Sequence, residues 1–386
     1  MHNTILDKDI TFTKKKDNWI LEHSEKYFVV SDEIKLLIEI LKKHNSNINE
    51  AYNDFIEQFE YVSKEEFSQI IEQNINNLEL DREHIESNKK EKSFILFETK
   101  ILSKENSAKL SKIIQPLYRP SFFWIVFALL FSLSIYNVFT IGEIHLEKKY
   151  ILFLFLTYIL TALIHEIGHI AACNRFTKKN GEIGIGVYFI FPVFYSNITP
   201  IWTATKQQRI ITNLAGVYIQ LYIVAFFYFI YLITGNIQIQ NVVAISTVVI
   251  LYQLIPFIRT DGYWILSDIT NSPNLLSNSS EEVIKFFKNP LKYKIVNKNN
   301  LLEFSYGLLN QLFMLYIVTN IIINYNIKLI DFPVELIKTI ITEPKQILNY
   351  LNNNIQLILI SVVFYMIVFN QIKRIIPNKN KEEAQQ

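Results

Sequence analysis

The sequence has very little cysteine and almost no excess charge of either sign. A single cysteine, Cys173, in a chain of 386 residues excludes an internal disulfide framework and a zinc finger built from several cysteines. A formal net charge of only +2 gives no indication of nucleic-acid binding. The first 16 residues lack the apolar segment of a secretory signal, so we expect this end of the chain to stay in the cytoplasm.

Apolar residues, by contrast, are abundant. Half of the chain is hydrophobic, although 19% of it is still charged, and this mixture indicates a polar region joined to an apolar one. We therefore expect a soluble domain over 1–90, a linker over 91–118, a membrane domain over 119–376 and a cytoplasmic tail over 377–386. The frequent Asn, Ile and Lys are typical of an AT-rich bacterial genome.

The soluble region shows strand patterns followed by helix patterns. "NWILEH" and "KYFVV" predict short strands, and a helix with apolar residues at helical spacing follows the cap candidate Ser31. A second helix carries Ala51 and Phe55 on one face, and a third begins with the capping box from Ser63 to Glu66. These patterns predict a small α+β domain of the winged-helix type. "SFILFETKIL" predicts one more strand before the membrane.

Apolar runs near 20 residues long recur after residue 120. They predict a mostly α-helical, polytopic membrane protein with about six spans, at 121–141, 151–173, 212–234, 241–258, 302–325 and 355–376. The apolar stretch 181–200 is interrupted by Gly and Pro, so we expect a short hairpin or re-entrant element there. Lys and Arg are concentrated in the regions before the first, after the second, after the fourth and after the last span, which places both termini in the cytoplasm of a bacterial cell.

The second predicted span carries the sequence HEIGH. His165 and His169 lie four residues apart, so both side chains can reach one metal ion from one face of a helix. Glu166 is rotated by about 100° and can serve as the base toward a water at that ion, whose pKa a zinc ion lowers to roughly 7. Ionisable residues in a span cost roughly 2.5–3.5 kcal/mol each, which favours a functional role.

A catalytic zinc ion takes three protein ligands, so the histidine pair needs a third. Cys173 lies about 12 Å along the axis from His165, too far for one ion to bind both in a straight helix. The other histidines fall outside the predicted spans: His2, His23, His44, His84 and His145. Asp261 is the candidate third ligand, because it ends an apolar run on the same predicted side of the membrane, after Pro256 and before Gly262. The alternative interpretation, an ordinary acidic residue exposed at a helix end, stays open.

HEIGH in one span and "PFIRTDGYW" closing another resemble the site-2 protease family of intramembrane zinc metalloproteases, in a form close to a subgroup described as peptide zinc metalloproteases. The resemblance covers roughly 120–270 and includes "NLAG" at 213–216. It implies that His165, His169 and Asp261 bind Zn²⁺ and that Glu166 is the catalytic base. The family asparagine eight residues before the aspartate is replaced here by Gln253, whose amide, like that of Asn213, is a candidate for holding the substrate or its oxyanion. For Asn213, a hydrogen bond between helices is the simpler interpretation.

The segment "WILEH…YFVVSDEIKLLIEIL" resembles PqqD-like domains, which recognise the leader of ribosomally made, modified peptides as an added strand. The combined resemblance implies a protease that matures a peptide precursor bound through its leader, with the lipid bilayer and an exporter as further partners and no nucleic acid. Two alternatives remain open. One is a regulatory protease that cuts a single-span signalling protein, and the other is a non-catalytic export component with structural zinc.

Overall fold

The computed structural model describes most of the chain. The described residues are 10–14, 18–24, 26–44, 47–57, 62–77, 96–140, 144, 147–188, 191–272, 274–295 and 297–375. The predicted tail 377–386 lies outside them, as do His2, His84 and His145. The chain forms two compact units. One consists of residues up to 256 with 260–265, and the other consists of 257–259 with the residues from 266 onward.

The N-terminal domain begins with an antiparallel sheet of three strands in the order β1-β2-β3. The strands are β1 (Thr11–Lys14), β2 (Trp19–His23) and β3 (Lys26–Val30), and they precede the helices α1 (Asp32–Lys43), α2 (Ile48–Ile56) and α3 (Lys64–Asn77). Leu21, Ile38 and Phe67 lie at the centre of the small core. The helices and the two predicted strands are confirmed, whereas β1 carries too short a pattern to be predicted. The winged-helix assignment remains a prediction.

Local capping defines where these helices begin. The Ser31 hydroxyl accepts a hydrogen bond from the backbone N–H of Ile34 at the start of α1. At the start of α3, Ser63 and Glu66 form the reciprocal capping box, in which each backbone N–H donates to the other side chain. Each such cap satisfies donors that the first helical turn leaves free, and it is typically worth about 1 kcal/mol.

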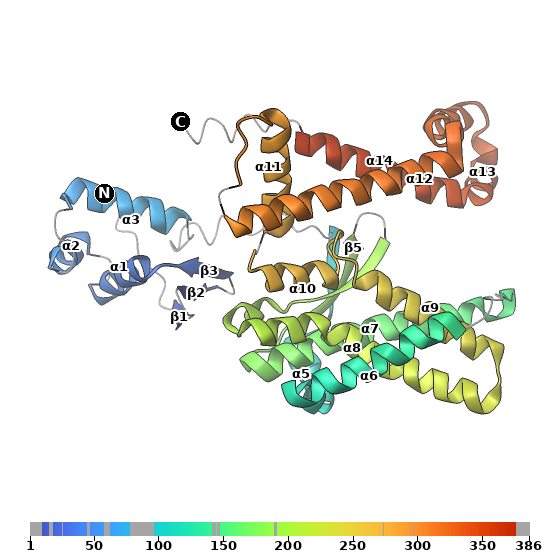
Figure 1. The fold of residues 1–386 in the computed structure, drawn as a ribbon, viewed down its shortest axis with the longest axis horizontal. Helices are drawn as coiled ribbons and strands as arrows, with labels where there is room; N and C mark the ends of the chain where they lie inside the picture. The colour runs from blue at the N-terminus through green and yellow to red at the C-terminus, as the bar shows by residue number, and fades with distance from the viewer. Residues whose placement is uncertain are drawn as a thin grey trace. The chain divides into compact units, whose positions relative to one another are not determined.

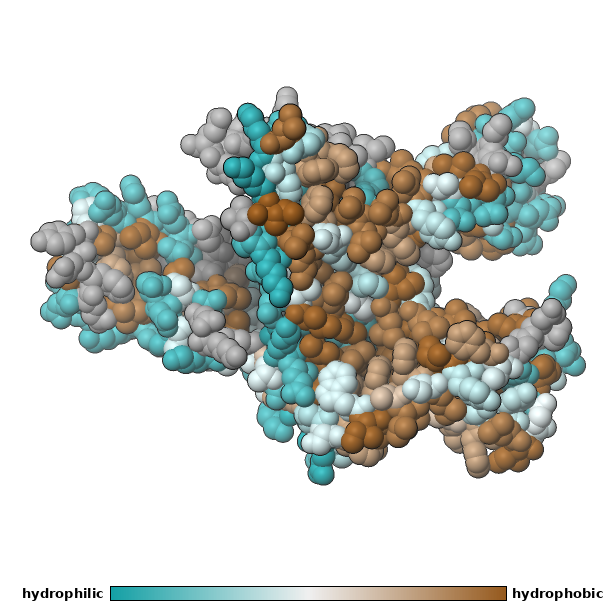
Figure 2. Space-filling model, viewed as in Figure 1, coloured by the Kyte–Doolittle hydropathy of each residue, from teal (hydrophilic) through white to brown (hydrophobic). Residues whose placement is uncertain are grey.

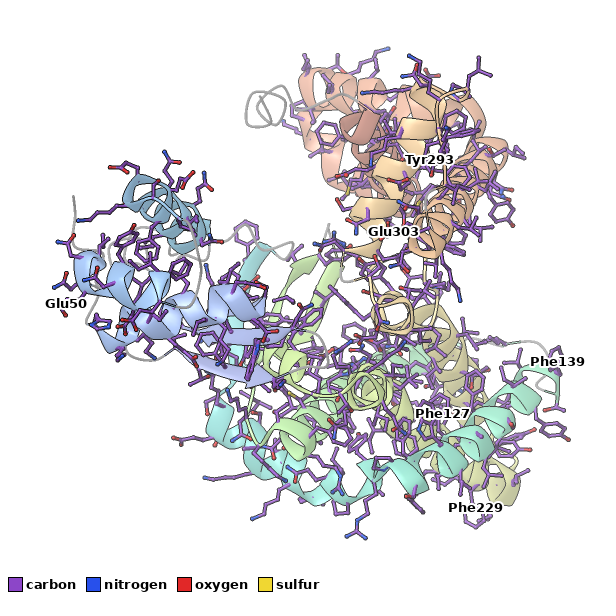
Figure 3. The ribbon with its side chains drawn as sticks, turned by 60° about the vertical axis from the view of Figure 1, so that its left-hand side comes forward. Glu50, Phe127, Phe139, Phe229, Tyr293 and Glu303 are labelled. Carbon is purple, nitrogen blue, oxygen red and sulfur yellow. The ribbon has the colours of Figure 1, made fainter. Side chains whose placement is uncertain are left out.

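Four helices of the first unit form the apolar bundle that carries the candidate site (Figure 1). They are α6 (Pro120–Thr140), α7 (Ile151–Thr177), α8 (Lys206–Thr234) and α9 (Ile237–Gln253). Aromatic packing joins α6 to α8, where the Phe123 and Tyr218 rings lie 4.5 Å apart. Phe127 lies within the bundle, whereas Phe139 and Phe229 project outward, with 83% and 62% of their surface exposed (Figure 3).

Apolar side chains also cover much of the outside of this bundle (Figure 2). On α7 alone, Leu152, Phe155 and Leu156 are each more than half exposed. Exposed apolar surface on this scale is unusual for a protein surrounded by water and is normal for one surrounded by lipid.

Four helices among the described residues are long and apolar enough to cross a membrane: Pro120–Thr140, Lys148–Thr177, Lys206–Thr234 and Lys298–Tyr325. The other two predicted spans are helices as well, but their apolar parts are shorter, at Ile237–Gln253 and Ile355–Phe369. Each of the six predicted spans therefore contains a helix, but the helix of the fourth ends at Gln253, so the predicted end at 258 is wrong: residues 254–258 form the turn that precedes Asp261. A membrane protein with four candidate spanning helices is what the structure supports, and the count of six and the orientation of the termini remain predictions.

A second three-stranded sheet stands beside the bundle and has the order β4-β5-β6. The predicted hairpin in 181–200 is present as β5 (Ile183–Tyr188) and β6 (Phe191–Ser196), which pair antiparallel. β4 (Leu96–Leu102), the strand predicted before the membrane, pairs antiparallel with β5. The range predicted as a linker, 91–118, thus contains β4 and α5 (Lys104–Ile114), and its first five residues lie outside the described part.

The second unit is helical. It contains α11 (Leu275–Lys288), the 45-residue α12 (Lys298–Thr342), α13 (Ile347–Asn353) and α14 (Ile355–Ile375), and α12 packs against both α11 and α14. The Asn310 amide donates a 2.8 Å hydrogen bond to the carbonyl of Phe257, whose ring packs on Phe313. Glu303, near the start of α12, accepts hydrogen bonds from Ser272 and Asn278 (Figure 3).

Candidate metal centre

The close crossing of α7 and α8 brings the HEIGH sequence against the helix that contains "NLAG". A Cβ added at Gly168 would come within 2.7 Å of the Ala215 carbonyl oxygen. A Cβ added at Gly216 would come within 2.4–2.5 Å of three atoms of the His165 ring. The two glycines therefore let the helix backbones approach until the histidine ring lies directly on α8, as small residues do at helix interfaces in membranes.

A tight turn after α9 brings the third polar side chain to the same place. The Thr260 hydroxyl donates a 2.9 Å hydrogen bond to the Ile255 carbonyl and closes the turn. Gly262 packs so closely on the Leu254 carbonyl that an added Cβ would lie 2.1 Å from its oxygen. Asp261 begins α10 (Asp261–Thr270) inside this turn, and its carboxylate faces α7.

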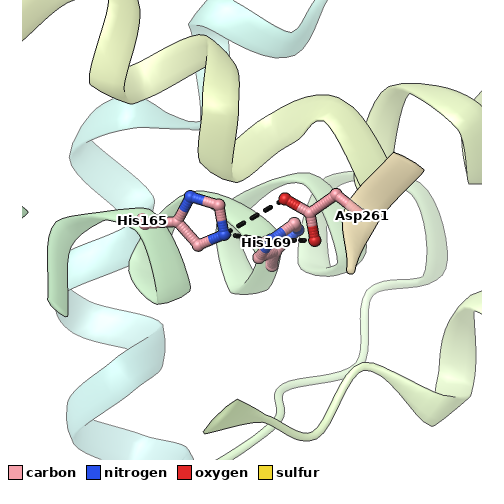
Figure 4. A group of neighbouring side chains, drawn as sticks. All are labelled: His165, His169 and Asp261. Atoms are coloured by element: carbon pink, nitrogen blue, oxygen red, sulfur yellow. Dashed lines mark hydrogen bonds and ion pairs between the residues drawn. The ribbon is translucent and has the colours of Figure 1, made fainter. Parts of the chain in front are cut away.

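The three side chains converge on one point (Figure 4). The Nε2 atoms of His165 and His169 lie 3.0 Å apart. The Asp261 oxygens Oδ2 and Oδ1 lie 3.2 Å from His165 Nε2 and 3.5 Å from His169 Nε2, respectively. One potential ligand atom from each residue lies within 4.8 Å of the others, and the histidines are buried. This is the one such group of three or more His, Cys, Asp or Glu side chains in the part of the chain that the structure describes.

These distances fit a bound divalent ion. Atoms that each lie about 2.0–2.1 Å from one tetrahedral ion are separated by about 3.3–3.4 Å, close to the observed spacing. Apart from its 3.2 Å contact with His165 Nε2, the buried Asp261 Oδ2 has no hydrogen-bond partner among the described residues, so a cation would satisfy it. Burial acts to raise the pKa of the Asp261 carboxyl, and positive charge on protonated His169 and His165 rings outweighs it and lowers that pKa; a cation bound between neutral rings would supply positive charge at the same place. Two imidazoles and one carboxylate are a typical zinc donor set.

The remaining ring nitrogens have partners on α8 that orient the histidines. His169 Nδ1 lies 2.7 Å from the backbone oxygen of Thr212, so it must donate a proton to that oxygen. His165 Nδ1 lies 3.0 Å from Oε1 of Gln220. When both Nδ1 atoms carry the proton, both Nε2 lone pairs face the point of convergence. Such partners fix the tautomer and ring orientation of metal-binding histidines.

Thr212, Gly216 and Gln220 are spaced by four residues and so form one face of α8 against the histidine pair. None of the three was expected from the sequence to act at the site. The signal that could have found them is this four-residue spacing, which matches the spacing of His165 and His169. It has no chemical signature of its own, because a carbonyl, a glycine and an amide are common in any membrane helix.

The other predicted site residues fall into different surroundings. Glu166 is part-buried on α7 and close enough to His169 to act on it electrostatically. Gln253, the last residue of α9, has a buried Oε1 atom with no hydrogen-bond partner in the described structure. Asn213 is buried within α8. Cys173 is buried and its sulfur lies 3.8 Å from the hydroxyl of Thr177 and from the carbonyl of Ile198, away from the histidine pair.

Comparison with known proteins gives one informative relative. A Bacillus subtilis protein named "Putative peptide zinc metalloprotease protein YydH" is 26% identical to this chain over 121 residues. The matched region is 28% of this chain and 44% of the relative, so the similarity covers less than half of either protein. No family model matches the chain, and no solved structure matches it. The chain is thus similar in part to a protein named as a zinc metalloprotease.

Proposed function

We propose that this protein is an intramembrane zinc metalloprotease that hydrolyses a peptide bond in a ribosomally made, modified peptide precursor. The convergence of His165, His169 and Asp261 supports the proposal most directly, because it brings together three zinc-type ligands, two of them on a helix that is apolar enough to cross a membrane. The name of the partial relative agrees with this chemistry.

Each residue has a defined part in the proposal. His165, His169 and Asp261 hold the ion, which supplies a Lewis acid and lowers the pKa of water toward neutrality. Glu166 accepts the proton that the attacking water loses and delivers it to the departing amine. Gln253 has a buried Oε1 atom with no partner among the described residues, which can accept a hydrogen bond from a peptide N–H. Its Nε2 group is the candidate donor to the peptide carbonyl or the oxyanion. Asn213 is the second candidate for that contact.

The peptide must reach the site in an extended form, because a helix hides its carbonyls. The outer strands of the β4-β5-β6 sheet each have one edge that pairs with no other described strand. β6 packs against α7, so a peptide added along β6 would run beside the helix that carries the histidines. In the same proposal, the leader binds as an added strand at an edge of the β1-β2-β3 sheet.

A cleavage assay with the purified full-length protein tests the enzyme class. The protein in detergent, loaded with Zn²⁺, is incubated with a mixture of apolar peptides, and mass spectrometry identifies new peptide ends. Glu166→Gln keeps every proposed ligand but removes the base, so we expect its cleavage rate to fall by about 10²- to 10⁴-fold. Equal product formation by the wild type and Glu166→Gln would contradict proteolysis and favour a structural zinc site.

A further inference from the structure

A small cavity lies between α7, α8 and α9, next to the candidate metal centre. Its volume is about 20 Å³, enough for a water molecule, which needs about 10–15 Å³. Leu154 and Val242 supply part of its apolar wall, and its polar lining includes Thr157, Thr161, Gln220 and Ser246. A buried water also needs two to four polar partners, and this lining provides them.

Gln220 belongs both to this cavity and to the metal centre. Its Oε1 atom lies 3.0 Å from Nδ1 of His165, and its side chain also lines the cavity. The other polar atom of the Gln220 amide, Nε2, has two protons to donate. The orientation of this amide decides the state of His165. If Gln220 Oε1 faces the ring, His165 carries its proton on Nδ1, and its Nε2 is free to bind metal. If Gln220 Nε2 faces the ring instead, His165 carries its proton on its own Nε2.

The threonines on α7 give the cavity a fixed hydrogen-bond polarity. The Thr161 hydroxyl donates its proton to the Tyr158 carbonyl at 2.9 Å, and the Thr157 hydroxyl donates its proton to the Phe153 carbonyl at 2.8 Å. Each hydroxyl has only one proton, so toward the cavity both oxygens can only accept. A water in the cavity must therefore donate to them, which leaves its lone pairs to accept from Gln220.

We propose that this cavity is a water site that sets the direction of a hydrogen-bond chain from α7 to the metal centre. The water donates to Thr161, accepts from Gln220 Nε2, and thereby holds Gln220 Oε1 against His165 Nδ1. The chain keeps the His165 Nε2 lone pair directed at the ion. Thr161 and Gln220 are then positioning residues, and the inference rests on the proposed metal-binding function.

Cobalt binding tests the chain without relying on cleavage. The purified protein in detergent is titrated with Co²⁺ against a competing chelator, and the visible absorption of the bound ion reports its geometry. Because loss of such supporting contacts typically weakens metal affinity by about 10- to 100-fold, we expect losses in this range for Thr161→Val and for Gln220→Leu. Thr161→Ser keeps the hydroxyl and should restore both the affinity and the spectrum. In a protein that already carries Gln220→Leu, Thr161→Val should cause no further loss of cobalt affinity, because both substitutions interrupt the same hydrogen-bond chain.

Thr247→Val is the matched control. Thr247 is buried on α9 and also donates to a backbone carbonyl, that of Val243, but it does not line the cavity. Its substitution should leave cobalt affinity unchanged. Three results would each overturn the water chain. Thr161→Val could bind cobalt as tightly as the wild type, or Thr161→Val and Thr247→Val could lose equal affinity. The third is a Thr161→Val/Gln220→Leu double variant in which the two losses of affinity multiply. His165→Ala must abolish the cobalt spectrum, and if it does not, the proposed metal centre itself is wrong.

Discussion

At the scale of single residues, the absence of a side chain at one position shapes the candidate site. Gly216 lies under the His165 ring, and no larger residue fits there without moving the ring or parting the helices. The site thus depends on backbone contact between α7 and α8 as much as on its three polar side chains. A sequence motif that lists ligands alone misses this requirement.

Gly216→Ala should displace the His165 ring and disrupt the metal centre. The added Cβ would lie 2.4 Å from His165 Cε1, so the ring must shift by roughly an ångström to restore normal contact. A misplacement of this size costs about 100-fold in rate in many enzymes, and we expect a loss of this order in peptide cleavage. Cobalt affinity of the variant should fall as well.

Gly235→Ala provides the comparison for Gly216→Ala. Gly235 ends α8 with a φ of +60°, and nothing lies within 4 Å of its added Cβ. Alanine there should lower the free energy of unfolding by about 1–2 kcal/mol through backbone strain while leaving the metal centre intact. If both alanine variants lost cleavage to the same degree, general destabilisation and not contact with His165 would explain the Gly216 result.

At the scale of elements, a charged cluster links α1 and α2. His44 Nε2 lies 2.8 Å from Asp54 Oδ2, which also accepts a 2.6 Å contact from Lys43 Nζ. The hydrogen bond to Asp54 raises the pKa of His44 above its ordinary value of 6.5. The hydrogen bonds from His44 and Lys43 lower the pKa of Asp54 below its ordinary value of 3.8.

These two shifts predict a pH window for the stability of the α1–α2 junction. The contribution of His44 is complete below pH 6.5 and is lost as the pH rises through its raised folded-state pKa. The contribution of Asp54 is complete above pH 3.8 and is lost as the pH falls through its lowered folded-state pKa. Hydrogen-exchange protection of α1 and α2 should therefore be greatest between these values. In His44→Gln, the hydrogen-exchange protection of α1 and α2 should not fall as the pH rises above this window. If it falls as much as in the wild type, His44 is not the cause of the fall.

The sequence predicts elements better than it predicts their partners. Helical periodicity and capping residues placed α1, α3 and the apolar helices, and the hairpin of β5 and β6 followed from an apolar run broken by Gly and Pro. The pairing of β4 with β5 could not be predicted, because register between segments so far apart is set by tertiary packing. At the site, the spacing of His165 and His169 is local information. Gln220, by contrast, becomes relevant only once α8 is placed against α7.

At the scale of the whole molecule, the candidate ion joins two separate parts of the first unit. His165 and His169 come from α7, whereas Asp261 comes from the turn after α9. A bound ion would therefore act as a cross-link that the unfolded chain lacks. Ligand binding to the folded state alone stabilises a protein by about 2.7 kcal/mol when the free ligand is at 100 times its Kd.

Metal removal should thus lower thermal stability. We expect the full-length protein in detergent to unfold at a lower temperature after chelation and to recover when Zn²⁺ is restored. Glu166→Gln keeps the ligands, so chelation should lower its unfolding temperature as much as that of the wild type. Chelation should lower the unfolding temperature of Asp261→Asn much less. A chelator effect of equal size in Asp261→Asn would place the stabilising ion elsewhere.

The β4-β5 pairing also constrains how the chain is made. About 80 residues separate the end of β4 from the start of β5, and both α6 and α7 lie between them. At a synthesis rate of roughly 5–20 residues per second, β4 is made about 4–16 s before its partner strand β5. Glu98 and Lys100 lie within β4, and charges of this kind discourage a waiting strand from joining another nascent chain.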